Sequence, residues 1–373
     1  MTERTLRGYE SLADFAPDWI SAPGETIAEL LDERGWSQAD FAVRTGFTAK
    51  HVHLLLQGKA GISEDAALRL ERVLGSSARF WLNLETQYRE QLLRRQAIAS
   101  FEQDVLWLKE LPLAEMIAFG WVEKASSKAL QVYACLRYFG VAPVDAWREQ
   151  YEKPVAAYRA AQKLTKKPAA VSAWLRQGER EAEKVRMGEY SREAFEAALS
   201  EIRGLTTESD PAKFMPSMME KCARAGVAVV VAPAPKGCPV SGATKWLSAN
   251  KALIMLSLRG KTDDRLWFTF FHEAAHLLRH GKRLTFLDIL GETGLNAEEE
   301  AEADAYARDF LIDAARYRSF CDSGRFTEAA IRGFAADEKI PPGVVVGRLQ
   351  FDRRLGWDRL NKLKVSYRWE HEA

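Results

Sequence analysis

Two histidines four residues apart, with a glutamate beside the first, are the residues of this sequence best suited to chemistry. They form the segment His272-Glu273-Ala274-Ala275-His276, inside an almost wholly apolar run. In a helix, positions i and i+4 lie on one face, so both imidazoles can reach one metal ion. Glu273 lies one step around the helix, where it can accept a proton from a water on that metal. The pattern predicts a Zn2+ site of the kind that hydrolyses peptide bonds, with Glu273 as the catalytic residue.

The helix that must carry these residues is expected from Arg265 to about His280, and Asp263 or Asp264 could cap its start. The apolar side chains that surround it on nearly every side are Leu266, Trp267, Phe268, Phe270, Phe271, Leu277 and Leu278. A helix that is apolar all round is buried. Burying two histidines and a glutamate in such a helix would cost free energy if their polar atoms had no partners. A metal ion would supply the partner.

A zinc site with an open position needs a third protein ligand. His280 lies one turn beyond His276, but three successive i+4 positions cannot easily converge on one tetrahedral ion. We therefore interpret His280 as structural or substrate-facing. A better candidate lies in the next helix, which is predicted to begin with a capping-box-like pair, Asn296 and Glu299, and to end at about Ile312.

Glu300 is the carboxylate that this next helix directs towards its buried face. At about 100° per residue, the apolar stripe of the helix consists of Ala303, Ala307, Phe310, Leu311 and Ala314. Glu300 lies in the middle of the stripe, and we predict it as the third ligand; Asp304, one turn later, could accept a hydrogen bond from a ligand histidine. Alternatively, the run Glu298–Glu302 is only an acidic helix start favoured by the helix dipole, which does not account for the orientation of Glu300.

From about Ala212 to its end, the sequence resembles an ImmA/IrrE-type metallopeptidase domain. The similarity lies in Phe271-His272-Glu273-Ala274-Ala275-His276, in Glu300-Ala301-Glu302-Ala303-Asp304-Ala305-Tyr306-Ala307 and in the segment Ile340–Leu355. The resemblance implies a zincin-like domain in which His272, His276 and Glu300 bind zinc and Glu273 is the general acid/base. Tyr306 stands where the family usually has Phe, and Leu311-Ile312-Asp313 replaces a common L-M-P, so the pocket shape is expected to differ.

The segments before the metal helix are expected to form a small sheet. Strands are predicted at Gly226–Val231, Thr244–Ser248 and Ala252–Ser257, with a Pro/Gly-rich loop through Gly242 between the first two. Residues 96–205 are predicted to be helical throughout and have no catalytic spacing. The examples are Trp107–Ala118, Ala129–Phe139, Ser172–Met187 and Ser191–Ile202.

Short capped helices occupy the N-terminal part of the chain. The first is predicted at Thr26–Arg34, and Ser37 caps a second that ends at Gly46. Thr48 then caps a third, Ala49–Gln57, and Ser63 caps a fourth that runs through Leu74. A fifth follows with Phe80, Trp81, Leu84 and Tyr88. Two short helices joined by a turn of three or four residues and followed by further helices are typical of a helix-turn-helix domain.

The stretch from Pro23 to about Leu92 is similar to the XRE-type domain of HigA-like antitoxins, through G-W-S-Q-A-D-F-A, Leu55-Leu56-Gln57-Gly58-Lys59 and R-F-W-L-N-L. The resemblance implies that the start of the second helix and the exposed face of the third meet DNA. The residues at these positions are Gln38, Thr48, Ala49, Lys50 and His53. Gln can pair with adenine and Lys with guanine or phosphate. The alternative is a module that only dimerises or docks protein. With Lys50 as the one clear cation of the third helix, strong DNA binding would call for a homodimer.

Length and composition are consistent with this organisation. A chain of 373 residues with 47% hydrophobic and 28% charged residues suggests two or three folded domains. We predict an arm at 1–24, the helix-turn-helix domain at 25–95, a middle helical region at 96–205 and the metallopeptidase domain at 206–373. The fold class is α+β, mainly α. The net charge of +1 gives no global sign of a nucleic-acid binder, and four scattered cysteines argue against thiolate zinc and disulfides.

Two functions remain open at this level. The first is a DNA-binding zinc endopeptidase in gene regulation that cleaves a repressor or another regulatory protein. The second is a HigA-like regulator or antitoxin whose zinc site is structural or catalytically silent. Both have operator DNA as a partner, and only the first has a protein substrate. No signal-peptide pattern and no membrane-spanning stretch occur in the sequence, so a cytoplasmic location is expected.

Overall fold

The computed structural model describes residues 21–152, 168–280, 286–289 and 297–369. The chain divides into two compact units that meet between Gln103 and Asp104. Most of it is helical, and a small sheet lies in the second unit, which confirms the mainly α part of the predicted fold class. The predicted boundaries of the arm, the helix-turn-helix domain, the middle region and the metallopeptidase domain remain predictions from the sequence. None of the described helices is long and apolar enough to cross a membrane.

The first unit is a bundle of helices. These are α1 (Pro23–Arg34), α2 (Gln38–Thr45), α3 (Ala49–Leu56), α4 (Glu64–Leu74) and α5 (Ala78–Ser100). The predicted caps are confirmed: the side chains of Ser37, Thr48 and Ser63 each accept a hydrogen bond from a backbone N–H in the first turn of their helix. The buried side chains at the centre include Ile27, Phe41, Val52, Leu55, Leu70 and Trp81.

Helix α1 begins earlier than predicted, so the last residues assigned to the N-terminal arm are helical. Pro23 opens the helix, as proline favours the first turn, where its missing N–H is not needed. Gly24 lies against α3, where an added Cβ would approach the carbonyl oxygen of Leu55 to 2.4 Å. The close packing of α1 on α3 therefore fixes this start. Residues 1–20 of the predicted arm lie outside the described residues.

The second unit begins in η1 (Phe101–Lys109), which crosses the boundary between the units. The helices that follow are α6 (Leu113–Ala118), α7 (Lys128–Phe139), α8 (Val144–Trp147), η2 (Arg148–Glu152), α10 (Pro168–Lys184), α11 (Arg192–Leu205), α12 (Pro211–Arg224), α13 (Asp263–Arg279), α14 (Ala297–Leu311), α15 (Ala314–Asp322), α16 (Glu328–Glu338), α17 (Pro342–Phe351) and η3 (Asn361–Leu363). The strands are β1 (Val227–Val231), β2 (Val240–Ser248), β3 (Lys251–Leu256) and β4 (Phe286–Ile289).

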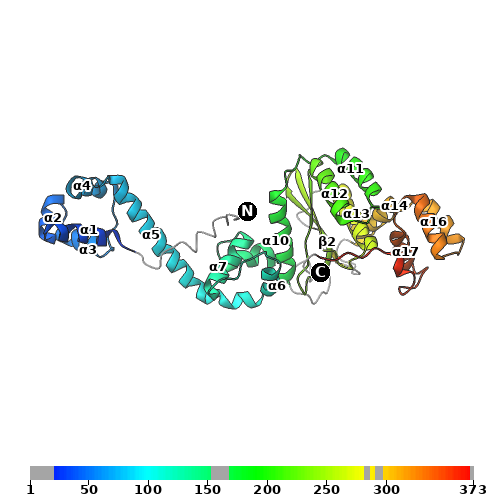
Figure 1. Cartoon of the computed structure of the whole chain (residues 1–373), viewed down its shortest axis with the longest axis horizontal. Coiled ribbons are helices and arrows are strands. Elements are labelled where there is room, and N and C mark those ends of the chain that lie inside the picture. Colours follow the sequence, from blue (N-terminus) through cyan, green and yellow to red (C-terminus); the bar gives the residue numbers. More distant parts are fainter. Residues whose placement is uncertain (1–20, 153–167, 281–285, 290–296, 370–373) are drawn as a thin grey trace, which may run out of the picture. The chain divides into compact units, whose positions relative to one another are not determined.

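The four strands form one mixed sheet in the order β1-β3-β2-β4. Strands β1 and β3 are parallel, whereas β2 is antiparallel to both β3 and β4. Helix α10 covers one face and helices α11, α12 and α13 lie on the other, as Figure 1 shows. Met255 of β3 packs against Gly178 of α10, while Ile254 joins the core on the α13 side. Helices on both faces explain why β1 and β3 are almost continuously apolar.

Two predicted elements differ from the structure. The helix expected at Trp107–Ala118 is interrupted, because Pro112 cannot continue it, and the chain forms η1 and α6 instead. Strand β2 begins at Val240 rather than Thr244, since pairing with both β3 and β4 extends it into the expected loop. Strand β4 was not predicted at all. Asn296, the predicted start of α14, lies outside the described residues.

Helix α13 packs on strands β2 and β3, and most of its residues are buried. Of its aromatic side chains, Trp267, Phe270 and Phe271 are fully buried among residues of α12, α14 and α17. Its start differs from the prediction, because Thr262 holds the N-cap position and neither Asp263 nor Asp264 does. The Oδ1 atom of Asp263 instead accepts hydrogen bonds from the N–H groups of Asp264 (2.9 Å) and Val365 (3.1 Å).

Asp263 makes the stability of this unit dependent on pH. The side chain is 1% exposed, and burial, followed by the nearby charge of Asp264, raises its pKa from 3.8 to about 7. Because the folded pKa lies above the unfolded one, the stability present at low pH is lost as the pH rises from about 4 to about 7. Asp263→Asn keeps the accepting oxygen and cannot ionise. We therefore expect a higher free energy of unfolding than wild type at pH 8 and little difference at pH 4, measured by urea unfolding.

Asp358→Asn, at an exposed position of the same unit, is the control and should leave the pH dependence unchanged. An Asp263→Asn protein that follows the wild-type pH dependence would show that this carboxyl does not titrate in the folded state.

Candidate functional site

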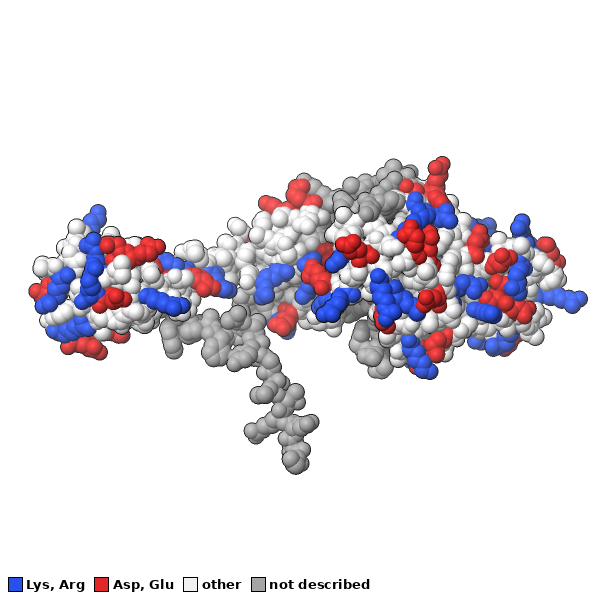
Figure 2. Space-filling model, turned by 90° about the horizontal axis from the view of Figure 1, so that it is seen from above, with Lys and Arg blue, Asp and Glu red and all other residues white. Residues whose placement is uncertain are grey.

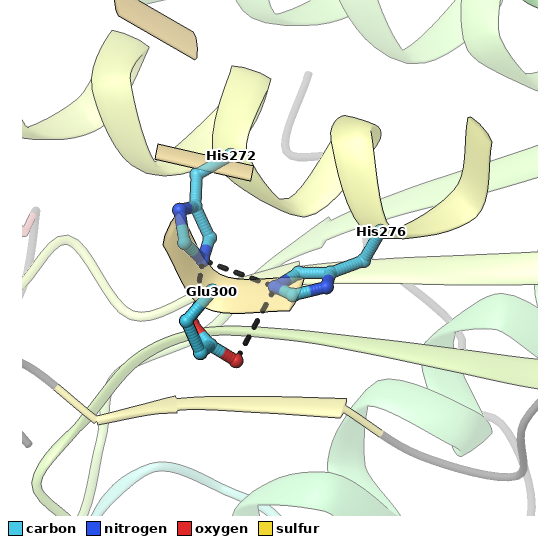
Figure 3. Close-up of side chains that lie close together, drawn as sticks. All are labelled: His272, His276 and Glu300. Atoms are coloured by element: carbon cyan, nitrogen blue, oxygen red, sulfur yellow. Dashed lines mark hydrogen bonds and ion pairs between the residues drawn. The ribbon is translucent and has the colours of Figure 1, made fainter. Parts of the chain in front are cut away.

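Helices α13 and α14 bring His272, His276 and Glu300 to one point (Figure 3). The Nε2 atoms of the two histidines are 3.1 Å apart. The Oε2 atom of Glu300 lies 3.2 Å from Nε2 of His272, and its Oε1 atom lies 3.6 Å from Nε2 of His276. Both histidines are at least 98% buried, whereas the side chain of Glu300 is 24% exposed. Three ligand atoms therefore converge in a largely buried place, and Glu300 is the most exposed of the three residues.

The electrostatics of this site favour an ionised carboxylate on Glu300 and a neutral imidazole on His276. Burial alone would raise the pKa of Glu300, but hydrogen bonds with His272 and His276 outweigh it and bring the pKa to about 2. Burial lowers the pKa of His276, and the hydrogen bond with Glu300 opposes this only in part. An ionised carboxylate and neutral imidazoles are the forms in which these side chains coordinate a metal.

The outer nitrogen of each histidine ring has its own partner. The Nδ1 atom of His272 lies 3.0 Å from Oδ1 of Asp304. The Nδ1 atom of His276 lies 2.8 Å from Nδ1 of His280, and Nε2 of His280 is 3.2 Å from Oε2 of Glu302. Two short chains of polar groups thus hold the rings with Nε2 turned towards Glu300. His280, interpreted from sequence as structural or substrate-facing, lies directly behind His276.

Glu273 is completely buried and lies against strand β2. The hydroxyl of Thr244 donates a hydrogen bond to its Oε2 atom at 2.6 Å. Gly242 gives the carboxylate its space, because an added Cβ would lie 2.4 Å from Oε1 of Glu273. Glu273 therefore lies on the strand side of α13 and is not one of the three converging ligands.

Thr244 and Gly242 did not stand out in the sequence, which indicated only a strand start and the end of a loop. They lie about 30 residues before Glu273. Only the packing of β2 on α13 brings them to the carboxylate. A glycine two positions before a threonine is a weak signal by itself.

The donor set fits zinc. Two imidazole nitrogens and one carboxylate oxygen, whose candidate ligand atoms all lie within 4.8 Å of one another, can hold a divalent cation of borderline softness. Calcium and magnesium prefer oxygen ligands only. The carboxylate of Asp304 beside Nδ1 of His272 is of the kind that orients a metal-binding histidine.

The second candidate site is the exposed face of α2 and α3 in the first unit. The two helices are joined by the turn Gly46-Phe47-Thr48, and Gly46 has a φ of +70°, which favours glycine. Val52 and Leu55 of α3 face the core. The five predicted contact residues Gln38, Thr48, Ala49, Lys50 and His53 are all exposed. The arrangement leaves one face of α3 free for a groove of DNA.

Charges on this unit are mixed. On the face seen in Figure 2, Lys and Arg side chains lie interspersed with Asp and Glu side chains. Arg69 pairs with Asp65 (2.8 Å) and its guanidinium lies over the ring of Phe47, so that this cation supports the turn before α3. Lys50 remains the one lysine within α3.

Known proteins resemble the first unit. Residues 27–81 match the helix-turn-helix protein family. The uncharacterized HTH-type transcriptional regulator YddM of Escherichia coli is 38% identical over 66 residues, which are 18% of this chain and 70% of that protein. A putative antidote protein of a plasmid maintenance system from Nostoc punctiforme is 31% identical over 22% of this chain and 91% of that chain, with a TM-score of 0.22.

An addiction module antidote protein of the HigA family from Coxiella burnetii is 28% identical, over 22% of this chain and 92% of that chain, with a TM-score of 0.21. The sequence matches agree with the caps, the turn and the buried core of helices α1 to α5, and the predicted helix-turn-helix domain is confirmed. Through these N-terminal residues, the chain belongs to the helix-turn-helix family of transcriptional regulators.

Proposed function

We propose that this protein is a transcriptional regulator that binds operator DNA through α2 and α3. The observation that carries the proposal is the exposed face of α3 within a domain similar to that of an HTH-type transcriptional regulator. Gln38 and Lys50 offer the hydrogen bonds that read base edges or hold phosphates, and Thr48 and His53 add polar contacts beside them. A homodimer would double this surface and raise the affinity accordingly.

Lys50→Ala is expected to weaken binding of the full-length protein to the DNA upstream of its own gene, measured by mobility shift at several salt concentrations. If Lys50 holds a phosphate, the slope of log affinity against log salt should fall by about 1. If Lys50 instead contacts a base, the difference in binding free energy between the correct and a wrong base at that operator position should fall by about 1–3 kcal/mol.

Arg72→Ala is the matched control, because Arg72 is an exposed cation on α4 of the same unit. A Lys50→Ala protein that binds as the wild type does would remove Lys50 from the interface. A wild-type protein that does not shift this DNA would contradict the proposed operator.

We further propose that the second unit is a zincin-like endopeptidase domain that cleaves a repressor or another regulatory protein, including a toxin–antitoxin partner. The observation in favour is Glu273, a buried carboxylate next to the three converging ligands and outside that set. A site that only stabilises structure has no use for such a group. The similarity of the region from Ala212 onwards to ImmA/IrrE-type metallopeptidases supports the same conclusion.

In this mechanism His272, His276 and Glu300 would hold zinc, and the metal would supply a Lewis acid for the peptide carbonyl and for water. Glu273 accepts the proton of the attacking water and returns it to the leaving amine. The Thr244 hydroxyl donates a hydrogen bond to Oε2 of Glu273 and so holds the carboxylate in position. Asp304 and His280 keep the two imidazole rings in their planes.

Metal analysis of the purified full-length protein tests the site itself. We expect one zinc per chain. A wild-type protein without zinc would contradict the peptidase proposal and leave the DNA-binding proposal unaffected.

His280→Ala is expected to lower the affinity for zinc by about 10- to 100-fold, because His276 would lose the group that orients its ring. Competition with a chromophoric chelator measures the affinity. Glu298→Gln, an exposed change on α14, is the control and should bind zinc as the wild type does. Unchanged affinity in His280→Ala would show that the ring of His276 is held by its burial alone.

A further inference from the structure

A pocket of about 100 Å³ lies among helices α13, α14 and α17, and the ring of Phe268, one of its walls, has its centroid 6.1 Å from that of His272. Its walls are mostly apolar and are formed by Phe268, Leu311, Ile312, Val344, Phe351 and Trp357. Phe351 and Trp357 are 55% and 56% exposed, although large apolar side chains are usually covered. The pocket is therefore open to solvent past two aromatic side chains. None of its lining residues is a candidate ligand of the zinc site.

Four charged side chains also line the pocket, and two of them have known partners. Arg348 pairs with Asp352 at 2.7 Å, and Asp264 pairs with Lys364 at 2.7 Å. Within the described ranges, Arg265 and Arg308 have no carboxylate partner. The Nε atom of Arg308 is buried without a hydrogen-bond partner there. A buried guanidinium nitrogen without an acceptor costs free energy, so an anion at the pocket would be stabilised.

The size and the lining of the pocket limit the ligand. An apolar cavity of 150 Å³ accepts benzene, so a pocket of about 100 Å³ suits a branched alkyl group of about four to five carbons. The apolar walls disfavour phosphate and sugar groups, which would lose water without gaining hydrogen bonds. Two arginines beside the pocket disfavour a cation. A single carboxylate matches the planar fork of a guanidinium.

We propose that this pocket binds a carboxylate that carries a compact branched apolar chain. The chain lies between Phe268, Ile312 and Val344, and the carboxylate accepts hydrogen bonds from Arg308, with Arg265 beside it. The same chemistry occurs in a free short-chain acid and in the C-terminal residue of a peptide that ends in leucine. Binding at this pocket requires neither zinc nor DNA.

Calorimetric titration of the full-length protein with 4-methylpentanoate tests the proposal, and 4-methylpentanamide is the matched neutral probe. We expect the acid to bind at least about tenfold more tightly than the amide, since a charged hydrogen bond contributes more than a neutral one. An acetylated dipeptide that ends in leucine distinguishes the two sources. Tighter binding of the peptide would assign the pocket to a chain terminus, and binding of the free acid alone would assign it to a small molecule.

Arg308→Gln should abolish the preference for the acid over the amide. Arg332→Gln should keep it, because Arg332 is an exposed arginine on α16 that pairs with Glu328. Val344→Phe fills the pocket from α17 and should abolish binding of both probes. The proposal is overturned if neither acid nor peptide binds the wild type, if acid and amide bind equally, or if folded Arg308→Gln and Val344→Phe proteins bind as the wild type does.

Discussion

Replacing Glu273 by glutamine is expected to lower cleavage of the regulatory protein by about 100- to 10,000-fold while zinc stays at one per chain. Glutamine has nearly the shape of glutamate, and the Thr244 hydroxyl can still donate a hydrogen bond to its amide oxygen. The fold and the ligands are therefore preserved, but the amide cannot accept the proton of the attacking water. Cleavage of proteins encoded beside this gene, followed by gel electrophoresis with matched zinc content, measures the effect.

Two controls make this result specific. Glu298→Gln changes an exposed glutamate of α14 and should cleave as the wild type does. Binding of Glu273→Gln to DNA should also be unchanged, because Glu273 belongs to the second unit. If zinc is present and Glu273→Gln cleaves and regulates as the wild type does, the protein acts as a regulator with a catalytically silent metal site.

His276→Ala is expected to reduce the zinc content of the purified protein from one per chain to nearly none. The substitution removes one of three ligands and leaves a carboxylate and a single imidazole, which is too few for a stable zinc site. Zinc bound only to the folded chain at about 1,000 times its dissociation constant contributes about 4 kcal/mol to stability. The thermal midpoint of wild type should therefore fall on chelation, and that of His276→Ala should not respond to zinc or chelator.

His53→Ala is the matched control, because His53 is an exposed histidine of α3 in the first unit. Its zinc content should remain that of the wild type. Comparison of both proteins after chelation separates the loss of metal from the cavity that the buried His276 side chain leaves. Zinc bound by His276→Ala with wild-type affinity would contradict the proposed ligand set.

Local structure could be predicted well where a few neighbouring residues decide it. Ser37, Thr48 and Ser63 each cap their helix through a hydrogen bond to a residue three positions later, so the cap is visible in the sequence. The same holds for the breaks at Gly35 and Gly46, whose positive φ ends the helix. The apolar spacing of Trp107–Ala118 continues across Pro112 and does not show the interruption that the proline causes.

The candidate metal site could be predicted only in part from the sequence. The i, i+4 spacing places His272 and His276 on one face, and the apolar stripe of α14 turns Glu300 inwards, so these three residues could be selected without coordinates. Their distances depend on how α13 and α14 pack. The pairing of His280 with His276 also follows helical spacing, and it gives the structural role that the sequence left open beside a substrate-facing one.

The sequence alone determined the capped helices of the first unit and the faces of α13 and α14 that carry histidine and carboxylate side chains. These features depend on contacts within one or two turns. The tertiary structure alone decided that β2 starts at Val240, that Gly242 and Thr244 hold Glu273, and that α13, α14 and α17 enclose an apolar pocket. Each of these needs contacts between residues about 30 or more positions apart, and no local pattern specifies which of many distant segments will pack together.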